Sequence, residues 1–216
     1  MRMAVEGGWP QELRRDRFWV DILLGGLIAL LLAIVLKTFV LGAIYVPSSS
    51  MEGTLLAGDY VLVNKLGHDI QRTRIGDVVL FRPPAGVMPG VQRDDLLFVK
   101  RCIARGGDTV AFVRGSIAVN RRPLLLPGTA ALWKNPEGGF AEQEGRSIVV
   151  PDGYLFLLGD NPSESYDSRA WGCIPERDVL GAAALVYWSI CPSWPPGEGH
   201  GQPGAIRWSR IGTIPR

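Results

Sequence analysis

The sequence predicts a mostly β protein that begins with a single transmembrane helix. Three observations lead to this expectation. The 27 glycines and 16 prolines among 216 residues favour many short strands and turns over long helices. One uninterrupted apolar stretch, from Ile22 to Leu36, stands near the beginning of the chain. Behind it, short runs of β-branched and aromatic residues recur toward the end, as strands require.

Charge and composition exclude several classes of protein. A formal net charge of +2 gives no electrostatic reason to expect nucleic acid as a partner. The content of 47% hydrophobic and 20% charged residues excludes a disordered tail protein. Two isolated histidines, His68 and His200, argue against a zinc site built from several histidines. Cys102, Cys173 and Cys191 form no C-x-x-C pair, and whether any two of them are linked stays open.

The expected membrane anchor covers residues 18–45. Phe18 to Val46 contains only two charges, Asp21 and Lys37. As a helix, its apolar core would be roughly 22 Å long, so flanking residues are needed to cross about 30 Å of hydrocarbon. The run is apolar on all sides, which favours an anchor. A cleaved signal peptide and a buried core helix of a soluble protein are the alternatives.

Basic residues set the expected orientation of this anchor. Four arginines precede the apolar run, whereas the first basic residue after Lys37 is Lys65. The positive-inside rule therefore places residues 1–17 in the cytoplasm and residues 46–216 outside it. The sequence thus predicts a single-pass protein of the cell (inner) membrane, with the lipid bilayer as one of its partners.

Residues 46–216 are expected to form a mostly antiparallel β domain. Clusters of glycine, proline and aspartate separate its apolar runs, as turns do. Between residues 114 and 150 lies a Gly-rich, weakly patterned part that we interpret as a variable insertion. The predicted strands are Tyr60 to Asn64, Val78 to Phe81, Leu96 to Ile103, Thr109 to Val113, Ile117 to Asn120, Ile148 to Val150, Tyr154 to Leu158 and Leu185 to Ile190.

The first candidate for chemistry is the serine run Ser48-Ser49-Ser50. It follows the anchor directly, so its hydroxyls are expected close to the membrane surface. Three serines after a proline are also typical of a plain turn or a helix cap. The run by itself therefore indicates a position for a nucleophile and no more.

The second candidate is Lys100, the only charge on its face of the predicted strand, beside Phe98 and Cys102. A lysine among apolar neighbours loses hydration, which lowers its pKa. A neutral lysine is a competent general base near pH 7. The plainer interpretation is a lysine that extends from a strand edge into solvent.

The third candidate, residues 159–172, is dense in hydrogen-bonding side chains and follows an apolar strand. Its Asp167 and Arg169 can pair or bind backbone groups, and the segment either supports a site or forms an elaborate turn. A serine beside the membrane, a lysine on an apolar strand and a polar loop together suit a Ser-Lys hydrolase.

Five motifs follow one another along the chain, and they resemble those of bacterial signal peptidase I, the membrane-bound Ser-Lys protease family. Each alone is weak evidence, and their common order makes the resemblance specific. The ending Ile206 to Gly212 is also similar. The five are Pro47 to Leu55, near P-S-x-S-M-x-P-T-L; Gly58 to Lys65, near G-D-x-V-x-V-x-K; Gly76 to Phe81; Phe98 to Asp108, near K-R-V-x-G-x-P-G-D; and Gly159 to Pro175, near G-D-N-x-x-x-S-x-D-S-R-x-W-G-x-V-P.

The resemblance implies a signal-peptidase-like antiparallel sheet, a hydrolytic activity and a role for each matching residue. Ser50 is the implied nucleophile and Lys100 the implied general base. The Ser50 backbone N–H and the Ser48 hydroxyl are the implied oxyanion donors. Ser165 is expected to orient the Lys100 amine, and Asp167 and Arg169 to brace their loop. These roles need no metal or cofactor, and the implied substrates are preproteins with an Ala-x-Ala-like site. The sequence does not fix the oligomeric state, for which a monomer is the expectation.

This sequence also departs from the family pattern. Gly53 replaces a proline of the serine motif, and Glu164 adds a negative charge beside Ser165. These differences leave room for a specialised pilin-type processing peptidase of a conjugation or secretion system. A relative of self-cleaving SOS-type repressors and a non-catalytic, membrane-tethered peptide-binding domain are the remaining alternatives. The lack of a basic helix-turn-helix region argues against the first of these two, and the intact serine and lysine argue against the second.

Overall fold

A computed structural model describes residues 11–35, 41–65, 73–87, 90, 96–113, 116–124, 126, 145–192 and 202–215. The chain divides into two compact units, Met1–Val40 and Leu41–Arg216, and each is described by itself. Several sequence-based expectations lie outside the described residues: both histidines, residues 1–10 and 36–40 of the N-terminal region, and residues 127–144 of the predicted insertion.

The first unit contains the helix α1 (Gln11–Val35). The side chains of residues 18–34 are all exposed, including large apolar ones such as Phe18, Leu23 and Ile34. Within the described part of the chain, no helix is both long enough and apolar enough to be a membrane span. The predicted anchor is therefore not confirmed.

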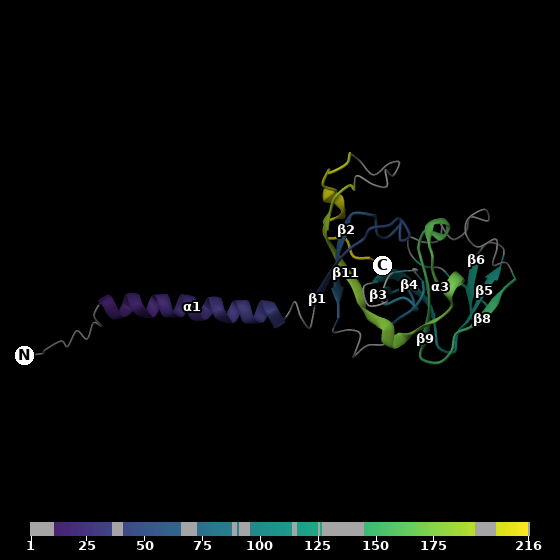
Figure 1. Ribbon diagram of the computed structural model, residues 1–216, viewed down its shortest axis with the longest axis horizontal. Helices are drawn as coiled ribbons and strands as arrows, with labels where there is room; N and C mark the ends of the chain where they lie inside the picture. The colour runs from purple at the N-terminus through teal and green to yellow at the C-terminus, as the bar shows by residue number, and fades with distance from the viewer. Residues whose placement is uncertain are drawn as a thin grey trace, which may run out of the picture. The chain divides into compact units, whose positions relative to one another are not determined.

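The second unit contains a seven-stranded sheet in which all described strand pairs are antiparallel, in the order β1-β2-β11-β3-β4-β9-β10 (Figure 1). This confirms the mostly β, antiparallel fold class. The long strand β11 lies between β2 and β3 and joins the two halves of the sheet. The strands of the seven-stranded sheet are β1 (Leu41–Tyr45), β2 (Asp59–Asn64), β3 (Val78–Phe81), β4 (Phe98–Arg105), β9 (Tyr154–Leu158), β10 (Ile174–Pro175) and β11 (Val179–Ser189).

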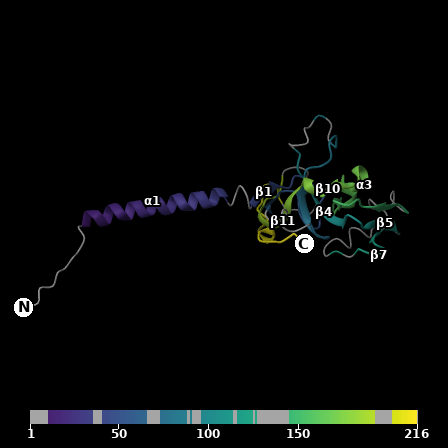
Figure 2. The same cartoon turned by 90° about the horizontal axis from the view of Figure 1, so that it is seen from below.

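A second, four-stranded sheet has the order β7-β6-β5-β8. Its described strands are β5 (Thr109–Val113), β6 (Ser116–Val119), β7 (Arg122–Pro123) and β8 (Ser147–Val149). Both views place this sheet at the opposite side of the domain from β1 and β11 (Figures 1 and 2). The remaining described elements are the helix α3 (Ser168–Trp171) and the short 3-10 helices η4 (Pro162–Glu164), η5 (Glu176–Asp178) and η6 (Trp208–Arg210).

Two boundaries differ from the sequence-based expectation. The anchor was expected to reach Tyr45, but Leu41–Tyr45 form β1, which pairs with β2 over its whole length. A charge-free apolar run does not distinguish helix from strand by itself. The strand β11 begins at Val179 rather than Leu185, because its first half is rich in glycine and alanine, which have weak strand preferences.

The apolar core beside the serine run fixes the segment that follows β1. Met51 and Leu55 are fully buried and pack in one cluster with Val61, Val78 and Val186. Burying a side chain of this size contributes about 1.5–3 kcal/mol. Apolar residues on one side of the serine run therefore attach it to β2, β3 and β11.

Candidate active site

Ser50 begins a tight turn between β1 and β2. The amides of Thr54 and Leu55 both donate to the carbonyl of Met51, at 3.1 and 2.8 Å. Gly53 has φ of 105° in this turn, a conformation that a proline cannot adopt because its ring holds φ near −65°. A proline at position 53 therefore could not replace Gly53 without changing this turn.

Lys100 lies on β4 opposite Val79 of β3. The paired part of β4 and β9 begins one residue later, with Arg101 opposite Leu158. Beyond the end of β9 the chain passes Ser50, whose carbonyl accepts a hydrogen bond from the Asn161 amide at 3.1 Å. The end of the β4–β9 pairing thus leaves room for the Ser50 turn beside Lys100.

The amine of Lys100 donates a hydrogen bond of 2.6 Å to the Ser50 hydroxyl. Both side chains are buried, with 4% and 7% of their surface exposed. The pairing of a serine on one turn with a lysine 50 residues away brings together the two residues that the sequence singled out. It also excludes, for this structure, the interpretation of Lys100 as a lysine extended into solvent.

Burial lowers the pKa of Lys100 from 10.5 to about 8, because the charged amine loses its hydration. Smaller effects of nearby charges follow. Asp167 raises this pKa, Arg169 lowers it and Asp160 raises it. An amine with this pKa is neutral in about one molecule in ten at pH 7, which makes it available as a base.

Ser48 is exposed, and its hydroxyl oxygen lies 3.3 Å from that of Ser50. The structure thus brings three of the predicted site residues into one chain of contacts, from Ser48 through Ser50 to Lys100. The hydroxyls and the amine offer donors and one nucleophile, the set that acyl transfer needs.

Asp167 and Arg169 hold the polar loop that follows β9. The Asp167 carboxylate is buried and accepts from the Gly159 amide at 3.0 Å. It also accepts from the Arg169 side chain at 2.7 and 2.9 Å, and that guanidinium donates to the carbonyls of Pro162 and Ser165. The pair therefore ties both ends of the loop together.

Ser165 does not make the expected bond to Lys100. Its hydroxyl oxygen is buried and has no hydrogen-bond partner among the described residues. It packs instead against Gly159, where an added Cβ would overlap the Ser165 side chain and come within 2.5 Å of the Ser50 carbonyl oxygen. The family pattern identifies the residue, but in this structure the hydroxyl contacts the glycine backbone.

Sequence reasoning missed a buried ion pair beside the two central residues. Arg101 is 1% exposed and donates to both carboxylate oxygens of Asp160, at 2.8 and 2.7 Å. It also donates to the Gly76 carbonyl at 2.7 Å and to the Thr54 hydroxyl at 2.7 Å. An arginine directly after Lys100 in a strand with apolar residues on both faces was the available signal, because a charge there needs a buried partner.

An apolar cavity of about 490 Å³ adjoins Ser50 and Lys100. Its wall is formed by residues 43–48 and 97–99, together with Met51, Leu80 and Tyr166. Glu164 also lines it and is exposed, yet it is not among the charges that shift the pKa of Lys100. The site therefore combines a serine hydroxyl, a buried amine with a lowered pKa and an apolar cavity.

Comparison with known proteins finds one family. Residues 19–188 match the family described as signal peptidase, peptidase S26. The chain is 33% identical over 180 residues to a protein of Synechocystis sp. named probable signal peptidase I-2, across 83% of this chain and 78% of that protein. It is 29% identical over 229 residues to signal peptidase I of Aquifex aeolicus, across 79% and 85%. Another relative, of Staphylococcus aureus, is named inactive signal peptidase IA and is 27% identical over 175 residues, across 78% and 91%.

Proposed function

Because this chain belongs to the signal peptidase family, peptidase S26, we propose that it is a membrane-bound endopeptidase that removes signal peptides from exported preproteins after an Ala-x-Ala-like site by a Ser50–Lys100 dyad. The observation that carries the proposal is the 2.6 Å contact between the Lys100 amine and the Ser50 hydroxyl. The family matches indicate a serine endopeptidase. One relative is named inactive, so the contact between the two side chains carries the assignment of the dyad.

In the proposed mechanism, neutral Lys100 takes the proton of Ser50 as the serine oxygen attacks the scissile carbonyl carbon. Collapse of the tetrahedral intermediate breaks the peptide bond, and the Lys100 ammonium gives its proton to the leaving amine. Lys100, neutral again, then deprotonates a water molecule that attacks the acyl-enzyme. The second collapse releases the signal peptide carboxylate and returns the proton to Ser50.

The developing oxyanion is assigned to the Ser50 backbone N–H and the Ser48 hydroxyl. The 3.3 Å separation of the two serine oxygens supports this assignment, because a carbonyl carbon bonded to the Ser50 oxygen would lie near the Ser48 hydroxyl. Removing one donor of this kind typically costs about 100-fold to 1000-fold in kcat. Asp167 and Arg169 act through the loop that they hold, which carries Gly159 against the Ser50 carbonyl.

Preproteins are the proposed substrates, and the cavity beside the dyad is proposed to select the small residues before the cut. Its apolar wall suits alanine-sized side chains, which gain from leaving water. A narrower substrate range, as in a pilin-type processing peptidase, is supported by the charge of Glu164 at the same cavity. Cleavage rates for a panel of preproteins that differ only around the cut distinguish a broad substrate range from a narrow one.

The helix α1 is proposed to tether the domain to the membrane, with the β domain outside the cytoplasm. The proposal is supported by the exposed apolar side chains along residues 18–34. A tether would hold the dyad at the surface in which a signal helix is embedded. Extraction of membranes with alkaline carbonate tests it: release of the full-length protein into the supernatant would contradict the tether.

Cleavage of a purified preprotein tests the function itself. The full-length enzyme in detergent is compared with Ser50→Ala and Lys100→Met, and with Ser49→Ala as a matched control in the same serine run. We expect cleavage after an Ala-x-Ala site by the wild type and the control, and none by the two dyad variants. Inert wild-type enzyme across several preproteins would contradict the proposal. Equal cleavage by Lys100→Met would contradict the assignment of the base.

A further inference from the structure

The C-terminal residues 205–213 are attached to β11 by main-chain hydrogen bonds. Ile206 bridges to Ile190, and the Arg207 amide donates to the Ser189 carbonyl at 3.0 Å. Further along, the Gly212 amide donates to Val186 at 2.8 Å, and the Val186 amide donates to the Thr213 carbonyl at 2.9 Å. We call residues 205–213 the C-terminal strap.

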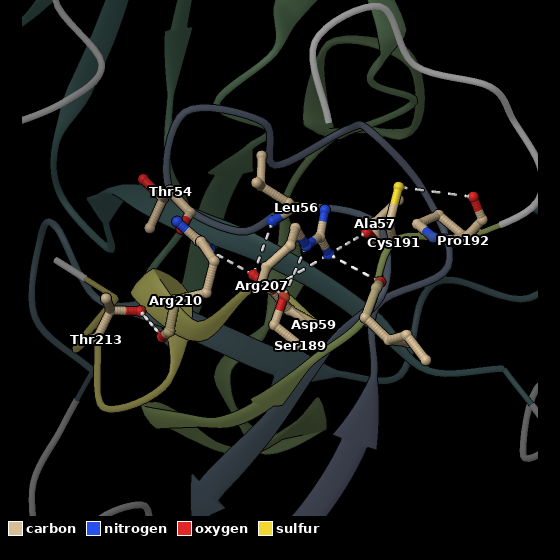
Figure 3. A network of polar contacts seen from close by, with 11 residues as sticks. Thr54, Leu56, Ala57, Asp59, Ser189, Cys191, Pro192, Arg207, Arg210 and Thr213 are labelled. Carbon is tan, nitrogen blue, oxygen red and sulfur yellow. Dashed lines mark hydrogen bonds and ion pairs between the residues drawn. The ribbon is translucent and has the colours of Figure 1, made fainter. Parts of the chain in front are cut away.

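The strap places two arginines on a buried carboxylate, that of Asp59 at the start of β2 (Figure 3). One carboxylate oxygen accepts from the Ser189 hydroxyl at 2.7 Å and from Arg207 at 3.4 Å. The other accepts from the Leu56 amide at 2.9 Å and from Arg210. A fully buried carboxylate is stable only with partners of this kind, so Asp59 fixes where both guanidinium groups lie.

Both arginines also reach backward to the chain that follows Ser50. Arg207 donates to the Ala57 carbonyl at 2.6 Å. Arg210 donates to the Thr54 carbonyl at 2.8 Å, and Thr54 is the residue whose amide closes the Ser50 turn onto Met51. The strap therefore contacts the far end of the turn that carries the nucleophile.

Thr54 is also held by Arg101 of β4, the strand that carries Lys100. The Arg101 guanidinium donates to the Thr54 hydroxyl at 2.7 Å and is itself fixed by Asp160. Arg101 directly follows Lys100 in β4. One threonine thus connects the strap, the Ser50 turn and the strand of Lys100.

We propose that Arg210 is a positioning residue that, through the Thr54 carbonyl and Asp59, holds the Ser50 turn in hydrogen-bonding distance of the Lys100 amine. The turn needs such external support because it contains Gly53 at φ of 105°, and glycine restricts its backbone less than any other residue. The kinetic part of this proposal rests on the proposed function, since it assumes that Ser50 and Lys100 react as a dyad.

Arg210 is expected to act by position and not through substrate contacts or charge. It is not among the residues that line the cavity, so substrate binding should change little. It is also not among the charges that shift the pKa of Lys100, so the pH midpoint of the reaction should stay the same. A displacement of reacting atoms by about 1 Å costs about 100-fold in rate.

The test uses Arg210→Gln and Arg210→Lys in the full-length protein. We expect kcat to fall about 100-fold in the glutamine variant, with KM within about threefold and an unchanged pH midpoint. The lysine variant keeps a positive charge beside the Asp59 carboxylate, so its kcat should be about tenfold higher than that of the glutamine variant. The control is Ile117→Val in the four-stranded sheet, which lowers thermal stability far from the turn and should leave kcat intact. Wild-type kcat in both Arg210 variants, or an equal loss in the control, would overturn the proposal.

Amide hydrogen exchange gives a readout that does not depend on activity. In either Arg210 variant we expect the amides of Thr54 and Leu55 to exchange at least about tenfold faster, while that of Phe112 in β5 keeps its wild-type rate. Equal acceleration of all three, or of none, would overturn the proposal. Should Arg210→Gln not fold, Arg210→Lys alone decides both measurements. Inert wild-type enzyme would contradict the proposed function, and the exchange rates would still decide the role of Arg210.

Discussion

Replacing Lys100 with methionine should make the protein more stable at pH 7 while it abolishes cleavage. The lysine is 4% exposed, and burial lowers its pKa from 10.5 to about 8. The folded state therefore holds the lysine proton less tightly than the unfolded state. Methionine has a similar length, suits apolar surroundings and carries no charge that loses hydration.

The magnitude follows from the two pKa values. At pH 7, the fall of the Lys100 pKa from 10.5 to about 8 on folding lowers the free energy of unfolding by about 3 kcal/mol. The variant also loses the hydrogen bond to Ser50, which is worth about 1 kcal/mol. We therefore expect Lys100→Met to be more stable than the wild type by about 2 kcal/mol at pH 7.

The sign of the pH dependence is fixed by the same values. The cost of Lys100 is fully present below pH 8 and is lost as pH rises toward 10.5, because the unfolded state then releases its proton as well. At pH 10 the remaining cost is about 1 kcal/mol, similar to the lost hydrogen bond. The difference between variant and wild type should therefore approach zero there.

Urea denaturation followed by tryptophan fluorescence, at pH 7 and pH 10, measures this difference. Arg177→Met serves as the control, because Arg177 is exposed and should show no pH-dependent gain. A variant less stable than the wild type at pH 7, or a gain that is the same at both pH values, would refute the reasoning that burial of Lys100 lowers its pKa.

Three further outcomes are expected. The pH profile of kcat/KM should fall about tenfold per pH unit below a midpoint near 8, the pKa of Lys100; a profile flat from pH 6 to 9 would exclude this base. Gly159→Ala should lower kcat about 100-fold, because its Cβ would meet the Ser50 carbonyl oxygen at 2.5 Å; unchanged steady-state kinetics would contradict this. Asp160→Asn should lower the free energy of unfolding by about 3–5 kcal/mol, because the charge of Arg101 stays buried beside a neutral amide; a urea midpoint within error of the wild type would show that the pair is not needed.

The order of elements and the position of Lys100 could be predicted from local patterns, whereas the choice of Ser50 within the serine run came from the resemblance to the signal peptidase family. The alternating pattern placed Lys100 on a strand with apolar neighbours and predicted a lowered pKa. In the structure, burial lowers the pKa of Lys100, in the predicted direction. The strands Val78–Phe81, Thr109–Val113 and Tyr154–Leu158 were predicted to the residue, because each is a compact run of β-formers bounded by turn residues. The first half of β11 was missed, since its glycine and alanines carry no strand signal.

Contacts between segments far apart in the chain could not be predicted in this way. Whether Ser165 donates to Lys100 or packs on Gly159 depends on differences of a few ångströms between two loops, which no residue pattern encodes. The partner of Arg101 was equally hidden, because Asp160 lies 59 residues away and several other carboxylates would satisfy a buried guanidinium as well.

The sequence by itself determined the mostly β fold and pointed to a serine and a lysine as a reacting pair, because strand periodicity, turn residues and a charge on an apolar face are local properties. Only the tertiary structure decided how that pair is held. It placed the amine 2.6 Å from the hydroxyl and put Thr54 between Arg101 and Arg210. Those distances result from the packing of three separate segments, and packing is a property of the whole domain.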